Sequence, residues 1–141
     1  MKHLRSVLVA AVACLAAAAV VRAADTKVIA NESVTASSIS AEELKGVFLA
    51  TKSVLSDGSH VEPVLQKGGA THEAFLKDYL GKTDAALSTY YRSLVFTGKA
   101  SMPKTVGSDA EVAAYVAKTK GAIGYVSAGA ATSGVKTMDV K

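Results

Sequence analysis

The chain has 141 residues, a net charge of +4 at pH 7, one cysteine and no tryptophan. This length is enough for one domain with a single hydrophobic core. The basic residues form no stripe with interleaved aromatic residues, so the composition argues against a nucleic-acid partner.

Residues 1–23 have the pattern of a secretory signal peptide. Lys2 and Arg5 precede an apolar run from Val7 to Val21, and small residues around Ala23 provide a cleavage point. Cleavage leaves residues 24–141 as one domain with 13 basic residues, 12 acidic residues and no cysteine. We therefore expect an exported, periplasmic protein that is stabilised by packing and not by disulfide bonds.

There are two alternatives to a cleaved leader. An uncleaved membrane anchor needs about 20 apolar residues, and this run is shorter and is followed by Arg22. A lipid-modified protein needs its cysteine after the apolar run, whereas Cys14 lies inside it. Both alternatives fit the sequence less well than a cleaved signal peptide.

The first predicted elements of the domain are a strand and a helix. Residues 27–31 form a short β-rich run. Ser40 and Glu43 then have the spacing of a capping box, and the apolar residues behind them recur at helical spacing, which predicts a helix over residues 41–49.

A second strand and helix follow. Residues 60–66 read as a strand, in which Pro63 indicates an edge or a bend. The two glycines after it precede an amphipathic helix that Gly81 ends.

The second half of the domain is predicted to contain two helices and two strands. Ser108 and Glu111 form another capping box. The predicted elements are helices over 83–96 and 109–118, a connecting loop over 100–107, and strands over 122–126 and 135–140. This order predicts an α/β fold with a mixed sheet flanked by helices.

The side chains that enzymes use are sparse. The mature chain offers only His60 and His72 as histidine bases, and Thr71 is adjacent to His72 on a predicted helix, where neighbouring side chains point apart. Two histidines twelve positions apart, without a cysteine, match no metal-ligand spacing. We therefore expect no enzyme, no metal and no cofactor, and a hydrolase that uses Thr71 or His72 is a remote alternative.

Two further groups of residues have both a functional and a structural interpretation. Tyr90, Tyr91 and Phe96 form either a stacking platform or part of the core. Residues 67–71, Lys67-Gly68-Gly69-Ala70-Thr71, form either an anion cradle at a helix start or a turn in which Thr71 caps the helix.

The order of motifs resembles a known family. The segment from Val28 to Ala128, and above all "GAIGYV" at residues 121–126, is similar to the phosphate-binding proteins of bacterial ABC phosphate importers, which are type II periplasmic solute-binding proteins. The similarity covers the segment that forms one of the family's two lobes. The resemblance thus implies a single lobe of a periplasmic-binding-protein type II fold.

The resemblance also implies a ligand and a site. In the family an arginine and a Gly-Ser-Gly-Thr stretch contact phosphate. Here Gly68-Gly69-Ala70-Thr71 matches that stretch, Lys67 adds a positive charge, and Leu65 stands where the arginine would be. The implied function is an exported, non-catalytic binding protein for phosphate or a related small oxyanion, with a homodimer and a membrane permease or envelope protein as partners. The alternative is a periplasmic protein-interaction module that has lost its ligand.

Overall fold

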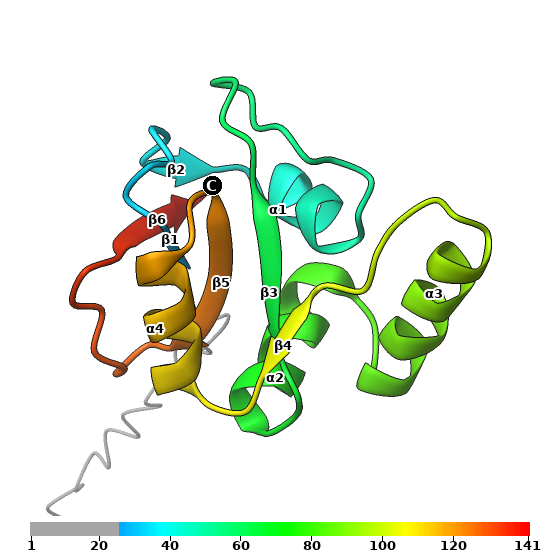
Figure 1. Ribbon diagram of the computed structural model, residues 1–141. Helices are drawn as coiled ribbons and strands as arrows, with labels where there is room; N and C mark the ends of the chain where they lie inside the picture. Colours follow the sequence, from blue (N-terminus) through cyan, green and yellow to red (C-terminus); the bar gives the residue numbers. More distant parts are fainter. Residues whose placement is uncertain (1–25) are drawn as a thin grey trace, which may run out of the picture.

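The computed structural model describes residues 26–141, so the predicted leader over residues 1–23 lies outside the described part of the chain. A six-stranded sheet and the helices around it make up the described fold (Figure 1). None of the helices within residues 26–141 is long and apolar enough to cross a membrane.

The sheet is mixed, as the sequence predicts. Its strand order is β2-β6-β1-β5-β3-β4, in which β3 runs parallel to β4 and β5, whereas β1 runs antiparallel to β5 and β6. The strands are β1 (Thr26–Ala30), β2 (Ser38–Ile39), β3 (Glu62–Gln66), β4 (Lys104–Val106), β5 (Ala122–Ser127) and β6 (Lys136–Val140).

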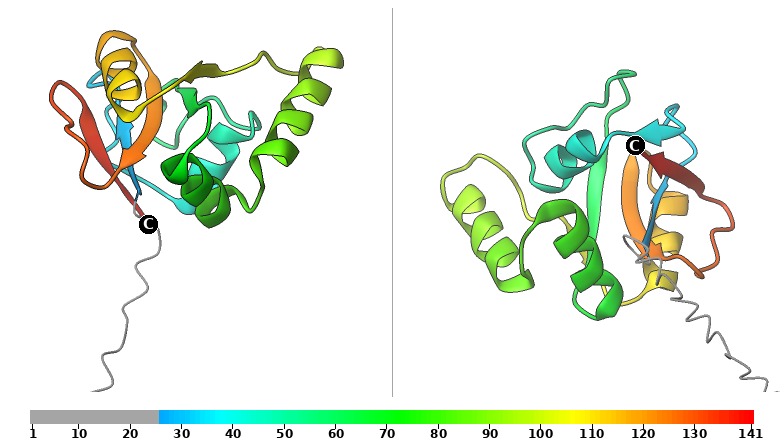
Figure 2. Two further views of the ribbon diagram at one scale, coloured as in Figure 1. Left: turned by 90° about the horizontal axis from the view of Figure 1, so that it is seen from below. Right: turned by 180° about the vertical axis from the view of Figure 1, so that it is seen from behind.

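Helices cover both faces of the sheet. They are α1 (Ala41–Phe48), α2 (Ala70–Phe75), which continues into the π-helical turn η1 (Leu76–Leu80), α3 (Asp84–Phe96) and α4 (Asp109–Lys118). Figure 2 shows α4 on one face and α1 and α2 on the other, with α3 standing apart from the sheet. The predicted α/β lobe with a mixed sheet is therefore confirmed.

In each predicted capping box, the hydrogen bond from the backbone amide of the glutamate to the serine hydroxyl forms. The Ser40 hydroxyl accepts a hydrogen bond from the Glu43 amide at 3.0 Å, and Ser108 accepts one from the Glu111 amide at 3.2 Å. The carboxylate of Glu43, however, accepts a hydrogen bond from Lys52 at 2.9 Å. Glu43 thus joins the start of α1 to the loop that follows this helix.

One prediction about the strands was wrong, and so was one of the two alternatives for Pro63. The predicted loop over 100–107 contains β4, a three-residue strand at the sheet edge that is too short to show a periodic pattern. Pro63 does not mark an edge, because β3 lies between β5 and β4. The amide of Glu62 already donates to the β5 side, at Gly121, and pairing with β4 begins only at Val64, so Pro63 removes no bond from the ladder.

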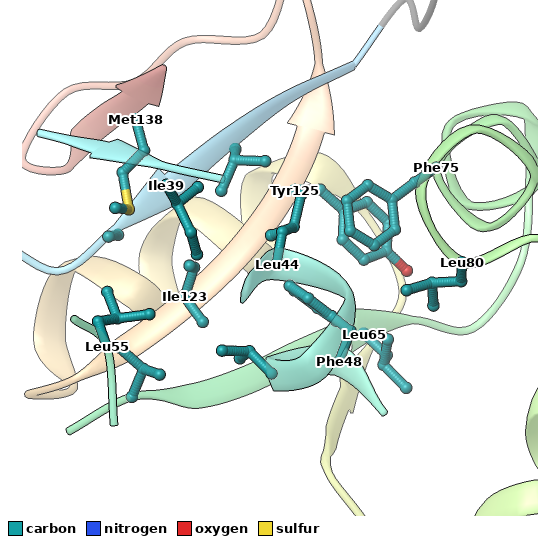
Figure 3. Packing of buried hydrophobic residues seen from close by; sticks show 14 of the residues in the cluster. Ile39, Leu44, Phe48, Leu55, Leu65, Phe75, Leu80, Ile123, Tyr125 and Met138 are labelled. Carbon is teal, nitrogen blue, oxygen red and sulfur yellow. The ribbon is translucent and has the colours of Figure 1, made fainter. Parts of the chain in front are cut away.

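The larger core lies between the sheet and the helices α1 and α2 (Figure 3). Its centre is aromatic: the rings of Phe75 and Tyr125 stack with centroids 3.9 Å apart, and Phe48 meets Phe75 edge-on at 4.9 Å. All three side chains are fully buried. This cluster fixes the position of α2 above β5.

The smaller core lies under α4. Val112 and Val116 of this helix pack against apolar side chains on the face of the sheet that points away from the larger core. Gly124 of β5 permits the close approach, because a Cβ atom at this position would lie 2.7 Å from Cγ1 of Val112. The second glycine of the "GAIGYV" motif is therefore required by packing.

Candidate functional site

Three parallel strands have their carboxyl ends on the same side of the sheet. Each of them is followed there by a loop or by the start of a helix. β3 leads into the glycine loop (residues 67–71) and α2, β4 leads into α4, and β5 ends at Ser127. In open α/β sheets this edge, outside the carboxyl ends of the strands, is where ligands bind. All five residues predicted to bind a ligand lie in this region.

The glycine loop presents unpaired backbone donors. None of the amides of Gly68, Gly69, Ala70 and Thr71 donates to an acceptor among residues 26–141. A Cβ atom placed on Gly68 or Gly69 meets nothing within 4 Å, so both glycines face open space. The loop is thus free to receive a ligand from outside.

Gly69, not Thr71, is the N-cap of α2. Its φ of 96° and ψ of 172° suit glycine, and no side chain caps the helix. The prediction that Thr71 caps this helix is wrong, because Thr71 already lies inside the first turn. The orphan amides therefore have no internal side-chain acceptor.

Lys67 is exposed and lies at the start of the loop. Its amide donates to the carbonyl of Val106 at 2.9 Å, which ties the loop to the end of β4. Its side chain also lines a pocket of about 240 Å³ whose other polar residues include His72 and Asp84. Lys67 thus directly precedes the free amides in the chain and brings one positive charge to this end of the sheet.

His72 lies in a buried hydrogen-bond chain that the sequence interpretation missed. Its ring is 1% exposed, Nε2 lies 2.7 Å from Oδ1 of Asp84, and Nδ1 is hydrogen-bonded to the Tyr125 hydroxyl. That hydroxyl in turn accepts a hydrogen bond from the Gln66 amide at 3.0 Å. The spacing of His72, Phe75 and Leu76 on one helical face was the signal for this burial.

The chain of hydrogen bonds has a structural role. Burial raises the pKa of the Tyr125 hydroxyl, which the hydrogen bond from Gln66 only partly opposes, so this phenol stays protonated. Both ring nitrogens of His72 are engaged, which leaves neither available as a base for Thr71. The geometry gives no support to a hydrolase that uses this pair.

Asp109 joins the ends of β3 and β5 to the start of α4. Its carboxylate accepts hydrogen bonds from Nε2 of Gln66 at 2.7 Å and from the Ser127 hydroxyl at 2.6 Å. Burial alone would raise the pKa of this carboxyl, but the bonds from Ser127 and Gln66 hold it below the usual value. The Ser108 side chain caps α4, whereas α2 has no side-chain cap, so the start of α2 is the more open of the two to an external anion.

The three aromatic residues considered as a platform do not act together. The hydroxyls of Tyr90 and Tyr91 donate to the carbonyls of Leu49 and Phe48, respectively, at the end of α1. Phe96 is 93% exposed and belongs to neither a platform nor the core. The structural interpretation is therefore correct for the tyrosines and wrong for Phe96.

The remaining candidate side chains lie apart from the loop edge. Leu65, which occupies the position of the family's arginine, faces the larger core and is 6% exposed. His60 is exposed, as expected, and it lies two residues before β3 in an isolated β-bridge with Val54. Within the described residues, no three His, Cys, Asp or Glu side chains lie close enough together to hold a metal ion.

Several solved structures that the chain matches are described as phosphate-transport or phosphate-binding proteins. A phosphate ABC transporter substrate-binding protein from Clostridium perfringens, with bound phosphate, matches with a TM-score of 0.62 at 14% identity. An ABC-type phosphate transport receptor from Vibrio cholerae matches at 0.54 and 15%, and PstS from Borrelia burgdorferi at 0.54 and 14%. The chain has the fold of these proteins.

The matches cover 82% of this chain but only 45%, 44% and 47% of the Vibrio, Clostridium and Borrelia chains. The chain thus spans less than half the length of the solved structures that it matches. No family model and no curated protein matches the sequence. The resemblance seen in the sequence is confirmed at the level of the fold.

Proposed function

We propose that this chain is an exported, non-catalytic binding protein for phosphate or a related small oxyanion. The observation that carries the proposal is the row of free amides from Gly68 to Thr71 at the carboxyl edge of the parallel strands. Such amides, at the positive end of a helix dipole, suit an anion. Lys67 adds one positive charge to the proposed site but does not replace the bidentate arginine of the family.

The proposed binding is weak for the isolated lobe. Leu65 points into the core and offers no donor, so one bidentate cation is missing. A hydrogen bond to a charged group contributes about 1.5–3 kcal/mol, and each 1.4 kcal/mol is a factor of ten in affinity. We therefore expect dissociation constants for phosphate in the micromolar to millimolar range.

Titration calorimetry with phosphate tests the proposal, and Gly68 is the best position for a variant. Because Gly68 lacks a positive φ and a Cβ atom meets nothing there, Gly68→Asp adds a carboxylate without strain. We expect Gly68→Asp to abolish the heat of phosphate binding through like-charge repulsion. Gly68→Asn is the matched neutral control and should retain binding. Equal affinity of the parent and Gly68→Asp would place the anion elsewhere.

The second candidate function is a protein-interaction module of the periplasm that keeps the lobe fold without a ligand. The burial of Leu65 at the arginine position favours it. A homodimer and a membrane permease or envelope protein are the partners that we propose in either case. The absence of heat at millimolar phosphate would favour this module over the binding protein.

A further inference from the structure

The exposed large hydrophobic side chains gather in one short segment. Within residues 26–141 they are Val95, Phe96 and Met102, which are 43%, 93% and 56% exposed. Single exposed apolar residues are common on protein surfaces, but three within eight positions of the chain form a patch. We call residues 92–102, at the C-terminal end of α3 and the turn after it, the α3 tip.

The helix that carries the α3 tip is held firmly at its other half. Leu87 and Tyr91 are buried, and the hydroxyls of Tyr90 and Tyr91 donate to adjacent carbonyls at the end of α1. Leu94 still packs against the larger core, and Figures 1 and 2 show the end of the helix and the following turn projecting from one side. The apolar side chains are thus carried by a helix that the core holds in place.

The turn itself is ordered by backbone hydrogen bonds. Gly98, with a φ of 71°, donates to the Val95 carbonyl at 3.1 Å, and the Lys99 amide donates to Leu94 at 2.9 Å. These bonds close the helix in the manner of a Schellman motif. The backbone conformation around Phe96 therefore holds its side chain in solvent.

The α3 tip itself carries only basic charges, and Glu62 of β3 is the acidic residue that lines the same pocket as Lys99 and Met102. Between Asp84 and Asp109 the chain contains no acidic residue, whereas Arg92, Lys99 and Lys104 are all exposed. Lys104 lies over the Tyr115 ring, 5.5 Å from its centroid, so Arg92 and Lys99 are the cations nearest to the apolar patch in sequence. A second copy of this surface would bring like charges together, whereas an anionic surface would complement them.

We propose that the α3 tip binds an anionic lipid surface. Phe96, Val95 and Met102 enter the interface between headgroups and acyl chains, and Arg92 and Lys99 contact the anionic headgroups. Exposed aromatic and aliphatic side chains next to basic residues are the combination that peripheral membrane attachment uses. This inference does not depend on phosphate binding at the glycine loop.

The absence of tryptophan permits a direct test in the full chain. Phe96→Trp places a single reporter at the α3 tip. We expect its fluorescence to shift to shorter wavelength with phosphatidylcholine vesicles that contain phosphatidylglycerol, and to shift little with phosphatidylcholine alone. Adding Arg92→Glu and Lys99→Glu should weaken the partitioning by at least about tenfold.

Two controls separate the tip from the rest of the protein. Ala114→Trp puts the reporter on an exposed position of α4, on the opposite side of the sheet from α1 and α2, and its emission should not shift. Lys118→Glu with Lys120→Glu, added to Phe96→Trp, makes the same charge change away from the tip and should leave the shift intact. Equal shifts for Phe96→Trp and Ala114→Trp would overturn the proposal.

Other occupants of the α3 tip give different outcomes. A shift without vesicles that grows with protein concentration would assign the tip to a second copy of the chain. A shift with polyglutamate but not with anionic vesicles would assign it to an acidic protein. Either result would overturn binding to lipid.

Discussion

The buried imidazole of His72 donates a hydrogen bond from Nε2 to the carboxylate of Asp84 at 2.7 Å. A carboxylate only accepts, so Nε2 carries a proton, and Nδ1 is hydrogen-bonded to the Tyr125 hydroxyl, which also accepts from the Gln66 amide. One buried side chain thus fastens the first turn of α2 to β5 and α3. The free amides of the glycine loop lie immediately before this anchor.

Removal of the Tyr125 hydroxyl tests this anchor. Tyr125→Phe keeps the ring stacked on Phe75 but leaves Nδ1 of His72 and the Gln66 amide without partners. We expect the free energy of unfolding, measured in urea, to fall by about 1–3 kcal/mol, the cost of an unsatisfied buried polar group. Tyr115→Phe is the control, because the Tyr115 hydroxyl bonds to no described residue. A loss of stability no larger than that of Tyr115→Phe would contradict the structural role of the hydrogen bonds around His72.

Local signals in the sequence predicted most of the elements. The serine caps, the helical spacing of apolar residues and the glycine stops placed α1, α3 and α4 to within a residue or two. These signals act between neighbours in the chain, so they are readable without a fold. The strand β4 has only three residues, and its pairing with β3 depends on a partner about forty positions away.

The candidate site was only partly readable from the sequence. The glycine loop is a local feature, and its free amides follow from the helix start that it precedes. The hydrogen bonds of Asp109 to Gln66 and Ser127, and of His72 to Tyr125, join residues 18 to 53 positions apart. Such pairs are set by the sheet topology, which no local pattern specifies.

Gly124 provides a test of the packing under α4. In Gly124→Ala the new Cβ atom would meet Val112 Cγ1 at 2.7 Å, and the branched valine has little freedom to move away. We expect Gly124→Ala to lower the free energy of unfolding by about 1–3 kcal/mol through overpacking. In the double variant with Val112→Ala the two losses should be less than additive. Additive losses would show that the two residues do not compete for space.

Asp109 should make stability depend on acid pH. Its pKa is depressed in the folded protein, so its contribution is complete above the unfolded value of about 3.9 and is lost as the pH falls through the lower folded value. We expect the free energy of unfolding to decrease below about pH 4 and to decrease less steeply in Asp109→Asn. Asp78→Asn, which removes an exposed carboxylate without a hydrogen bond to the described residues, is the matched control for the substitution. The same slope in Asp109→Asn and the parent would contradict this assignment.

The open face of the glycine loop leads to a prediction about assembly. Gly68 and Gly69 meet no atom that would limit the approach of a second chain, and each lobe supplies only one row of amides and one Lys67. A symmetric dimer with facing loops would surround a doubly charged anion with two rows of amides and two lysines. We expect sedimentation velocity to show tighter association at millimolar phosphate, and Gly68→Asp to remove this effect. A monomer with and without phosphate throughout the micromolar range would exclude a shared site between two copies.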